Sequence, residues 1–179
     1  MLSDISGTRR KAQKAAQSFL GVQGPLDELG WGVSGFVFAE PGGQGAIKVH
    51  HTDEAYRTEI RVYKLLERRA ITELCGLTIP HLKGYSDSRH LIHIDVVSPP
   101  FLLDFAGVRF SNPGFSADTM SDIHTMIRSR FGRNAHLAYC VYGSFLKYGV
   151  YYLDLRQSNL NIEGHPDLDS GPELEDETY

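Results

Sequence analysis

Apolar residues recur with the period of an α-helix in four segments of the chain. These segments are residues 6–20, 53–69, 118–131 and 135–148. Small polar residues of the kind that cap helices precede the last three segments. Gly21 and Gly149 follow the first and the last, where a left-handed residue commonly ends a helix. We therefore predict four helices.

Shorter runs rich in β-branched and aromatic residues predict strands at residues 36–39, 46–49, 80–85 and 90–97. The turn residues Pro41, Gly42 and Gly43 separate the first two runs, so we expect these to form an antiparallel pair. Short strands are also predicted directly after Gly149 and again near residue 160.

The composition is that of an ordinary globular chain. Of the 179 residues, 41% are hydrophobic and 22% are charged, and the formal net charge of -4 argues against binding to nucleic acid. No apolar run has the length of a membrane span, and the first residues lack a signal-peptide pattern, so we expect no membrane partner and a cytoplasmic location. Cys75 and Cys140 lie among apolar residues, which suggests reduced packing residues in a reducing compartment.

The segment 149–162 carries three polar residues at close spacing, Asp154, Arg156 and Asn159. An Asp at the start of such a loop can accept a hydroxyl proton, an Arg can hold phosphate oxygens, and an Asn can ligate magnesium. This order suits phosphoryl transfer. The alternative is a polar turn between two strands with no chemical role.

Gly30, Gly32 and Gly35 form the pattern G-x-G-x-x-G-x-V, which ends at Val37. A dinucleotide-binding loop would open a helix after its third glycine, whereas this chain continues with the predicted strand 36–39. The pattern is therefore typical of a hairpin whose backbone can lie over phosphates. A tight turn without a ligand is the alternative.

Lys48 lies within an apolar predicted strand, where an unpaired ammonium group would be costly. Glu59, in the helix predicted at 53–69, lies beside Ile60 on the expected sheet-facing side and can pair with Lys48. The alternative is a solvated Glu59 among basic residues of its own helix.

Together these features resemble the protein kinase-like superfamily. Residues 45–48 match three positions of its strand motif V-A-I-K, and residues 152–159 match the Asp, Leu and Asn of its catalytic loop H-R-D-L-x-x-x-N. Tyr152 and Leu153 replace the His and Arg of that loop. The resemblance covers residues 26–162. It implies an α+β fold with a small antiparallel β-sheet lobe, one packed helix, and a reduced, mostly helical second lobe.

The resemblance also implies ATP and Mg²⁺ as cofactors and assigns roles to residues. The catalytic set would be Asp154, Arg156, Lys48 and Glu59. The nucleotide would be held by Gly30, Gly32, Gly35, Val37, Ala46, Lys48, Val97 and Ser98. Asn159 and Asp104 would hold the metal ion.

Asp104 and the link before it depart from the family pattern. Ser98, Pro99 and Pro100 stand where a kinase has its hinge, and proline offers no N–H to an adenine ring. Asp104-Phe105-Ala106-Gly107 resembles the D-F-G triplet but precedes the catalytic loop instead of following it. Asp104 is then either a rearranged metal ligand or part of an ordinary turn in which Phe105 fills the core.

The expected organisation is a helical extension at 1–25, a kinase-like lobe at 26–98, a reduced helical lobe at 99–165 and a disordered acidic tail at 166–179. Activation-loop and A-P-E segments are missing. The first hypothesis is a minimal phosphotransferase that transfers the ATP γ-phosphate to a protein Ser/Thr or a small-molecule hydroxyl. The alternatives are a pseudokinase, with the basic N-terminal helix or the acidic tail as a docking site for a protein partner, and an unrelated α+β protein.

Overall fold

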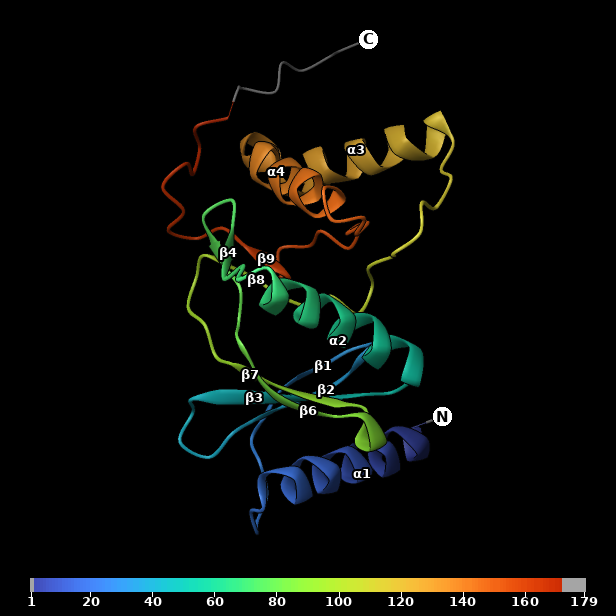
Figure 1. Cartoon of the computed structure of the whole chain (residues 1–179), viewed down its shortest axis with the longest axis vertical. Helices are drawn as coiled ribbons and strands as arrows, with labels where there is room; N and C mark the ends of the chain where they lie inside the picture. Colours follow the sequence, from blue (N-terminus) through green and yellow to red (C-terminus); the bar gives the residue numbers. More distant parts are fainter. Residues whose placement is uncertain (1, 172–179) are drawn as a thin grey trace. The chain divides into compact units, whose positions relative to one another are not determined.

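The computed structural model describes residues 2–171, and their side chains from residue 6 onward. The fold is α+β, and the chain divides into two compact units. Among the described residues, the first unit contains 2–70 and 80–96, and the second contains 71–79 and 97–171. Figure 1 labels the helices and most of the strands. None of the described helices combines the length and the apolar character needed to cross a lipid bilayer.

The first unit is built on a five-stranded antiparallel sheet with the strand order β1-β2-β3-β7-β6. The strands are β1 (Glu28–Trp31), β2 (Gly35–Ala39), β3 (Gly45–His50), β6 (Leu82–Ser86) and β7 (Leu91–Asp95). A short 3₁₀ turn, η1 (Asp87–Arg89), joins the last two strands. The predicted antiparallel pair is confirmed as β2 and β3, and β1 adds a strand that includes Gly30 of the glycine pattern.

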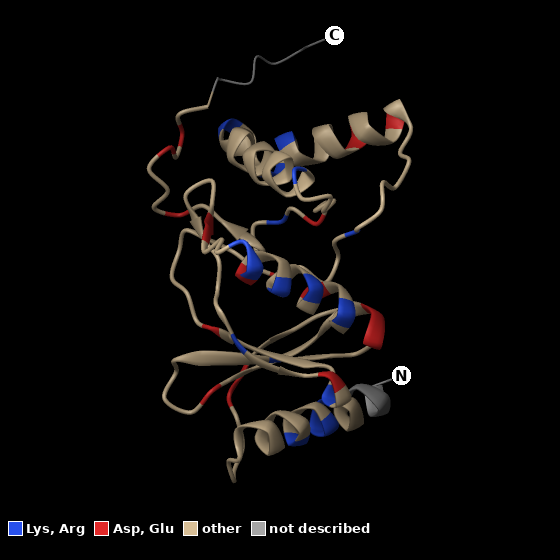
Figure 2. Ribbon diagram, in the orientation of Figure 1, with Lys and Arg blue, Asp and Glu red and all other residues tan. Residues whose placement is uncertain are grey.

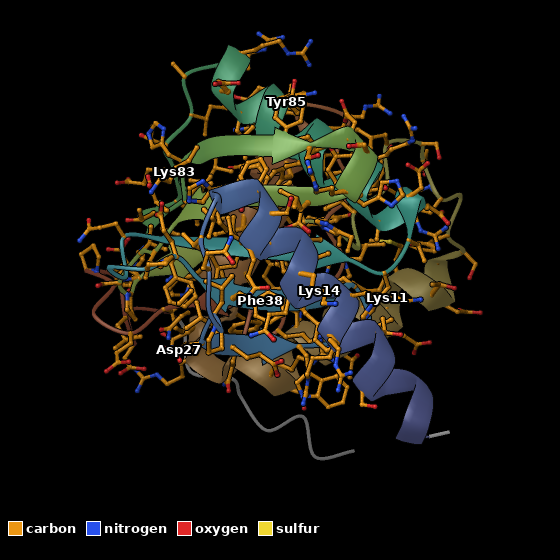
Figure 3. All side chains as sticks on the ribbon, turned by 90° about the horizontal axis from the view of Figure 1, so that it is seen from below. Lys11, Lys14, Asp27, Phe38, Lys83 and Tyr85 are labelled. Carbon is orange, nitrogen blue, oxygen red and sulfur yellow. A yellow bond between two sulfur atoms is a disulfide. The ribbon has the colours of Figure 1, made fainter. Side chains whose placement is uncertain are left out.

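The helices α1 (Leu2–Leu20) and α2 (Asp53–Arg68) cover opposite faces of this sheet (Figure 1). Figure 3 shows α1 lying across its face of the sheet, and Lys11 and Lys14 on this helix are exposed to solvent. The buried side of α1 contributes Ala12 and Ala16, whose small side chains allow close packing. The core cluster on this face contains Ala12, Ala16, Leu26, Phe36, Phe38, Ile47, Val49 and Leu91.

The helix α2 begins where the sequence predicted a cap, because the Thr52 hydroxyl accepts a hydrogen bond from the Ala55 N–H at 3.2 Å. Its buried residues are Tyr56, Glu59, Ile60, Val62, Tyr63 and Leu66. Lys and Arg residues follow the rest of this helix along its length (Figure 2). One strongly acidic side chain, Glu59, is thus turned toward the sheet while the basic residues remain outside.

The second unit combines a four-stranded sheet with the helices α3 (Ala117–Phe131) and α4 (Ala135–Leu146), which a short 3₁₀ turn, η2 (Gly132–Asn134), connects. Its strands are β4 (Glu73–Leu74), β5 (Leu77–Thr78), β8 (Phe101–Leu102) and β9 (Leu160–Asn161), in that order. The strand predicted directly after Gly149 is reduced to an isolated bridge between Tyr151 and Arg109.

The boundaries between the units differ from the expected division in three places. The described part of the expected extension 1–25 belongs to the first unit, and Val97 and Ser98, expected in the first lobe, belong to the second unit. Residues 71–79 were expected in the first lobe but belong to the second unit, because β5 pairs in parallel with β8 at Thr78 and Phe101. Residues 166–171, expected in the tail, form turns, and the Asn134 side chain accepts a hydrogen bond from the Asp169 N–H at 2.7 Å. The acidic residues 172–179 lie outside the described part of the chain.

The expectation of two reduced cysteines is wrong, since Cys75 and Cys140 form a disulfide. Cys75 lies in the turn between β4 and β5 with φ of +53°, and Cys140 lies in α4. Each cysteine has an apolar neighbourhood in the sequence, but only the tertiary structure brings them to the same place. The cysteines therefore no longer support the expectation of a reducing compartment, because structural disulfides are typical of oxidising ones.

Candidate active site

Lys48 and Glu59 form the centre of the first group of predicted residues. Lys48 Nζ lies 2.7 Å from Glu59 Oε2, and the exposed fractions of the two side chains are only 8% and 1%. The strand β3 supplies the Lys and α2 supplies the Glu. The predicted ion pair is therefore present, and the alternative of a solvated Glu59 is wrong.

A third side chain, His50, completes this group. His50 follows Lys48 by two positions in β3, so the two side chains extend from the same face of the strand. His50 Nε2 lies 2.7 Å from the same Glu59 oxygen that contacts Lys48. No role was predicted for His50 from the sequence. The sequence did contain a signal for it: a residue two positions from Lys48 in a strand extends from the same face as Lys48.

The electrostatics of the group keep Glu59 ionised. Burial by itself would raise the pKa of Glu59, but the positive charge of Lys48 and the hydrogen bond from His50 outweigh it and lower the pKa to about 2. A buried carboxylate with such partners remains charged at every physiological pH. It can therefore hold the Lys48 ammonium group in a fixed place.

Val37 and Ala46 share the sheet face of Lys48. Val37 lies directly opposite Lys48 in the register of β2 and β3, and Ala46 precedes Lys48 by two residues. Residues directly opposite each other, or two apart along one strand, extend from the same face of a sheet. The other predicted nucleotide contacts, Val97 and Ser98, lie at the start of the second unit, after β7 ends at Asp95.

The three glycines of the hairpin have different reasons for being glycine. A side-chain carbon at Gly35 would lie 2.2 Å from the Val49 carbonyl oxygen, so the close approach of β2 to β3 requires a glycine there. At Gly30 and Gly32 such an atom would meet nothing within 4 Å, and neither residue has a positive φ. The fold of this unit therefore does not require glycine at these two positions.

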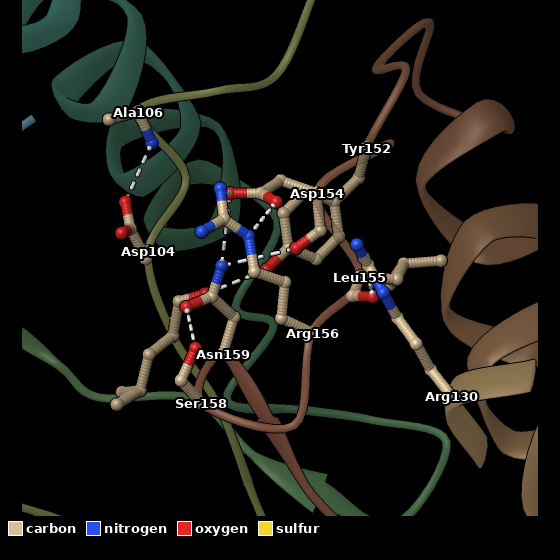
Figure 4. Close-up of polar contacts among 10 residues, drawn as sticks. Asp104, Ala106, Arg130, Tyr152, Asp154, Leu155, Arg156, Ser158 and Asn159 are labelled. Atoms are coloured by element: carbon tan, nitrogen blue, oxygen red, sulfur yellow. Dashed lines mark hydrogen bonds and ion pairs between the residues drawn. The ribbon is translucent and has the colours of Figure 1, made fainter. Parts of the chain in front are cut away.

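Asp154, Arg156 and Asn159 form the second group, in the second unit (Figure 4). Arg156 donates to both carboxylate oxygens of Asp154, from Nη2 to Oδ2 at 2.8 Å and from Nε to Oδ1. The Asn159 amide nitrogen donates to the Asp154 backbone carbonyl at 3.1 Å and to Oδ2 at 3.3 Å. The structure thus brings together three residues that the sequence analysis placed in one catalytic loop.

The acidic residues around Arg156 favour its charged form. The hydrogen bonds to Asp154 raise the pKa of Arg156, and the negative charge of Asp104 adds to this effect. Asp104 is therefore an electrostatic neighbour of the group. Its Oδ1 accepts a hydrogen bond from the Ala106 N–H at 3.3 Å, and its φ is +57°.

Residues on either side hold the loop in place. Arg130 of α3 donates to the Leu155 carbonyl at 3.0 Å, and the Gln157 side chain donates to the Arg130 carbonyl at 3.0 Å. Leu155 itself is buried. These bonds fix the loop backbone on both sides of Arg156.

Phe105 and Tyr152 connect the segment at Asp104 with the catalytic-like loop. Phe105 is fully buried, and its ring centroid lies 5.6 Å from that of Phe145 and 5.8 Å from that of Tyr152. The Tyr152 hydroxyl donates to the Leu103 carbonyl at 2.8 Å. Phe105 therefore fills the core, while Asp104 beside it is half-buried. Tyr152, which stands where the catalytic-loop motif H-R-D-L-x-x-x-N has His, is a packing and hydrogen-bonding residue.

The oxygen atoms of Asp104 and Asn159 are of the kind that Mg²⁺ prefers, and such an ion commonly takes its remaining ligands from phosphates and water. Asn159 is buried, and its amide nitrogen is engaged by Asp154. This orients the amide oxygen, which accepts from the Ser158 hydroxyl at 3.1 Å. The chemistry of these donors fits the predicted ion.

Neither the models of known protein families nor the curated proteins gave a match to this chain. The resemblance to the protein kinase-like superfamily therefore remains a prediction from its motifs.

Proposed function

We propose that this protein is a minimal ATP-dependent phosphotransferase that transfers the γ-phosphate of ATP to a hydroxyl group of a protein Ser/Thr or of a small molecule. The observation that carries the proposal is the buried ion pair that Lys48, on the strand that follows the glycine hairpin, forms with Glu59 of α2. A cation buried at the cost of desolvation is weak evidence for stability and is more readily explained by a functional role.

The nucleotide half of the proposal rests on the first unit. Lys48, held by Glu59, binds the α- and β-phosphates of ATP. The hairpin at Gly30 and Gly32 covers the phosphates, and Val37 and Ala46 contact the base. The two glycines support this role because the fold itself does not require them.

The acceptor half rests on the second unit. Asp154 orients the acceptor hydroxyl and takes up its proton, and Arg156 stabilises negative charge on the phosphoryl group. Asn159 keeps Asp154 in place through its two hydrogen bonds. When bound, a magnesium ion held by Asp104 and Asn159 would neutralise charge on the phosphates.

A second candidate function is that of a pseudokinase, which binds a nucleotide or a protein partner without transferring phosphate. The observation in its favour is the paired state of Asp154, because Arg156 donates to both of its carboxylate oxygens. An acceptor hydroxyl would have to displace one of these bonds. If Asp154 stays paired when ATP is bound, the chain retains nucleotide binding and lacks transfer activity.

The test combines ATP binding and ATP turnover. Titration calorimetry with ATP, with and without magnesium, and release of ADP are measured for the wild type, Lys48→Arg and Asp154→Asn. Arg keeps the charge of Lys48 but not its compact shape, so we expect binding to weaken at least tenfold. Asp154→Asn should keep binding and lose turnover. Circular dichroism confirms that each variant is folded.

Matched controls are Lys11→Met and Asp122→Asn, which remove one exposed charge each. Both should behave as the wild type. Binding without turnover in the wild type would select the pseudokinase. No binding of ATP by the wild type would refute the phosphotransferase and the nucleotide-binding form of the pseudokinase.

A further inference from the structure

His50 is a buried ionisable residue to which the proposed reaction assigns no role. Its side chain has an exposed fraction of 0%, and it lies at the end of β3 beside the ion pair of Lys48 and Glu59. A buried imidazole needs polar partners for its ring nitrogens, since an unpaired polar group is costly in the interior. The partners of His50 show what it does.

Both ring nitrogens of His50 lie near hydrogen-bond acceptors. Nε2 is 2.7 Å from Glu59 Oε2, and Nδ1 is 3.1 Å from the His90 carbonyl oxygen. The backbone N–H of His50 donates to the same carbonyl at 2.9 Å. The imidazole is thus held between the helix α2 and the residue before β7.

The other groups around the ring complete this environment. The ring of Tyr56 in α2 packs against that of His50 with a centroid distance of 5.7 Å, and its hydroxyl donates to Asp87 at 2.6 Å. The ring of His90 stacks on that of Tyr56 with a centroid distance of 5.6 Å, and His90 Nε2 lies 3.2 Å from Asp53 Oδ1. These contacts restrict the rotation of His50.

The decisive feature is that one oxygen atom receives two donors. Lys48 Nζ and His50 Nε2 both lie 2.7 Å from Glu59 Oε2. The Glu59 side chain has several rotatable bonds, so the position of its carboxylate relative to Lys48 depends on the other groups that the carboxylate contacts. His50 supplies that second contact from a ring that can hardly rotate.

We propose that His50 is a positioning residue for Lys48, acting through Glu59. Its Nε2–H holds Glu59 Oε2 at the point from which that oxygen holds the Lys48 ammonium group. The consequence for ligand binding rests on the proposed function, in which Lys48 binds the phosphates of ATP. Loss of the Nε2 donor then weakens ATP binding although His50 itself touches no part of the nucleotide.

Two substitutions separate this role from simple packing. His50→Gln places an amide nitrogen near the position of Nε2 and can still donate to Glu59. His50→Asn reaches only the position of Nδ1, near the His90 carbonyl, and cannot. Both variants replace the ring by an uncharged amide, so they are matched in polarity.

The first measurement does not depend on the proposed function. The energetic coupling between Lys48 and Glu59 is obtained from urea unfolding of Lys48→Met, Glu59→Gln and the double variant. This cycle is measured with His, Gln and Asn at position 50. The second measurement is the Kd for ATP with magnesium in the wild type, His50→Gln and His50→Asn.

We expect the coupling energy between Lys48 and Glu59 to stay near its wild-type value with Gln at position 50. With Asn at this position it should fall to a small fraction of that value. The Kd for ATP should rise about tenfold in His50→Asn, which corresponds to about 1.4 kcal/mol, and less than twofold in His50→Gln. Equal effects of the two substitutions, or unchanged coupling in His50→Asn, would show that His50 only packs and would overturn the inference.

Two other outcomes are a His50→Asn variant that does not fold and a wild type that does not bind ATP. If His50→Asn does not fold, the wild-type protein decides: the Nε2–H of His50 should give a downfield imidazole proton resonance protected from exchange with water. Its absence overturns the inference. If the coupling follows the expected pattern but the wild type does not bind ATP, the proposed function fails while the positioning of Lys48 by His50 stands.

Discussion

Replacing Glu59 by Gln removes the negative charge of the buried ion pair with almost no change in shape. The pKa of Glu59 is lowered from its ordinary value of 4.5 to about 2. Each unit of pKa shift corresponds to about 1.36 kcal/mol, so the ionised form of Glu59 stabilises the folded state by about 3 kcal/mol. Breaking a buried ion pair by removing one partner typically costs a similar amount, about 3–5 kcal/mol.

The pH dependence of this difference follows from the direction of the shift. Because the pKa of Glu59 is lowered in the folded state, its contribution is fully present above about pH 4.5, the unfolded value, and is lost as the pH falls toward 2. Glu59→Gln resembles the protonated wild type at every pH. The free energies of unfolding of the two proteins should therefore differ by about 3 kcal/mol at pH 7 and converge in acid.

The assay is urea unfolding followed by far-ultraviolet circular dichroism at a series of pH values between 7 and the lowest at which the wild type is folded. Glu67→Gln is the matched control, because Glu67 is an exposed residue of the same helix. Its effect should stay within about 0.5 kcal/mol. A difference below about 1 kcal/mol for Glu59→Gln, or one that does not shrink in acid, would refute the burial and pairing of Glu59.

The remaining predictions concern the disulfide and the glycine hairpin. The disulfide closes a loop with a sequence separation of 65 residues, so Cys75→Ala/Cys140→Ala should lower the free energy of unfolding by about 4 kcal/mol in the chain-entropy model. Protein purified without reductant and unfolded in urea should show no free thiol by titration, and two free thiols would contradict the pairing. Gly35→Ala should destabilise the protein by roughly 1–3 kcal/mol through the clash with the neighbouring strand, whereas Gly32→Ala should stay within about 0.5 kcal/mol. Urea unfolding checks both, and equal effects would refute the separate roles of the two glycines.

The disulfide bears on the cellular compartment expected for this protein. The expected cytoplasmic location was supported in part by two reduced cysteines, and this part is withdrawn because Cys75 and Cys140 are bonded. The bond fastens the turn between β4 and β5 to α4, within the second unit. Thiol titration of the protein from its native source would therefore bear on its compartment as well as on its stability.

Much of the fold and of the Lys48–Glu59 pair could be predicted from the sequence. Periodicity, caps and turn residues are local properties, and they predicted the four helices and the main strands of the first sheet. An isolated Lys in an apolar strand requires a counter-charge, and the helix register offered Glu59. These predictions succeed because Lys48, which needs a counter-charge, and Glu59, which supplies it, both lie in segments with a clear hydrophobic pattern.

The rest depended on contacts between distant segments, which no local pattern encodes. The disulfide joins residues on a turn and a helix, and Gly35 is fixed by the backbone of a neighbouring strand. His50 was overlooked because its importance comes from sharing one oxygen of Glu59 with Lys48. The sequence determined which residues could carry charge and where the elements lie. Only the tertiary structure decided which of these charges meet, since pairing in the interior depends on distances of a few ångströms between elements.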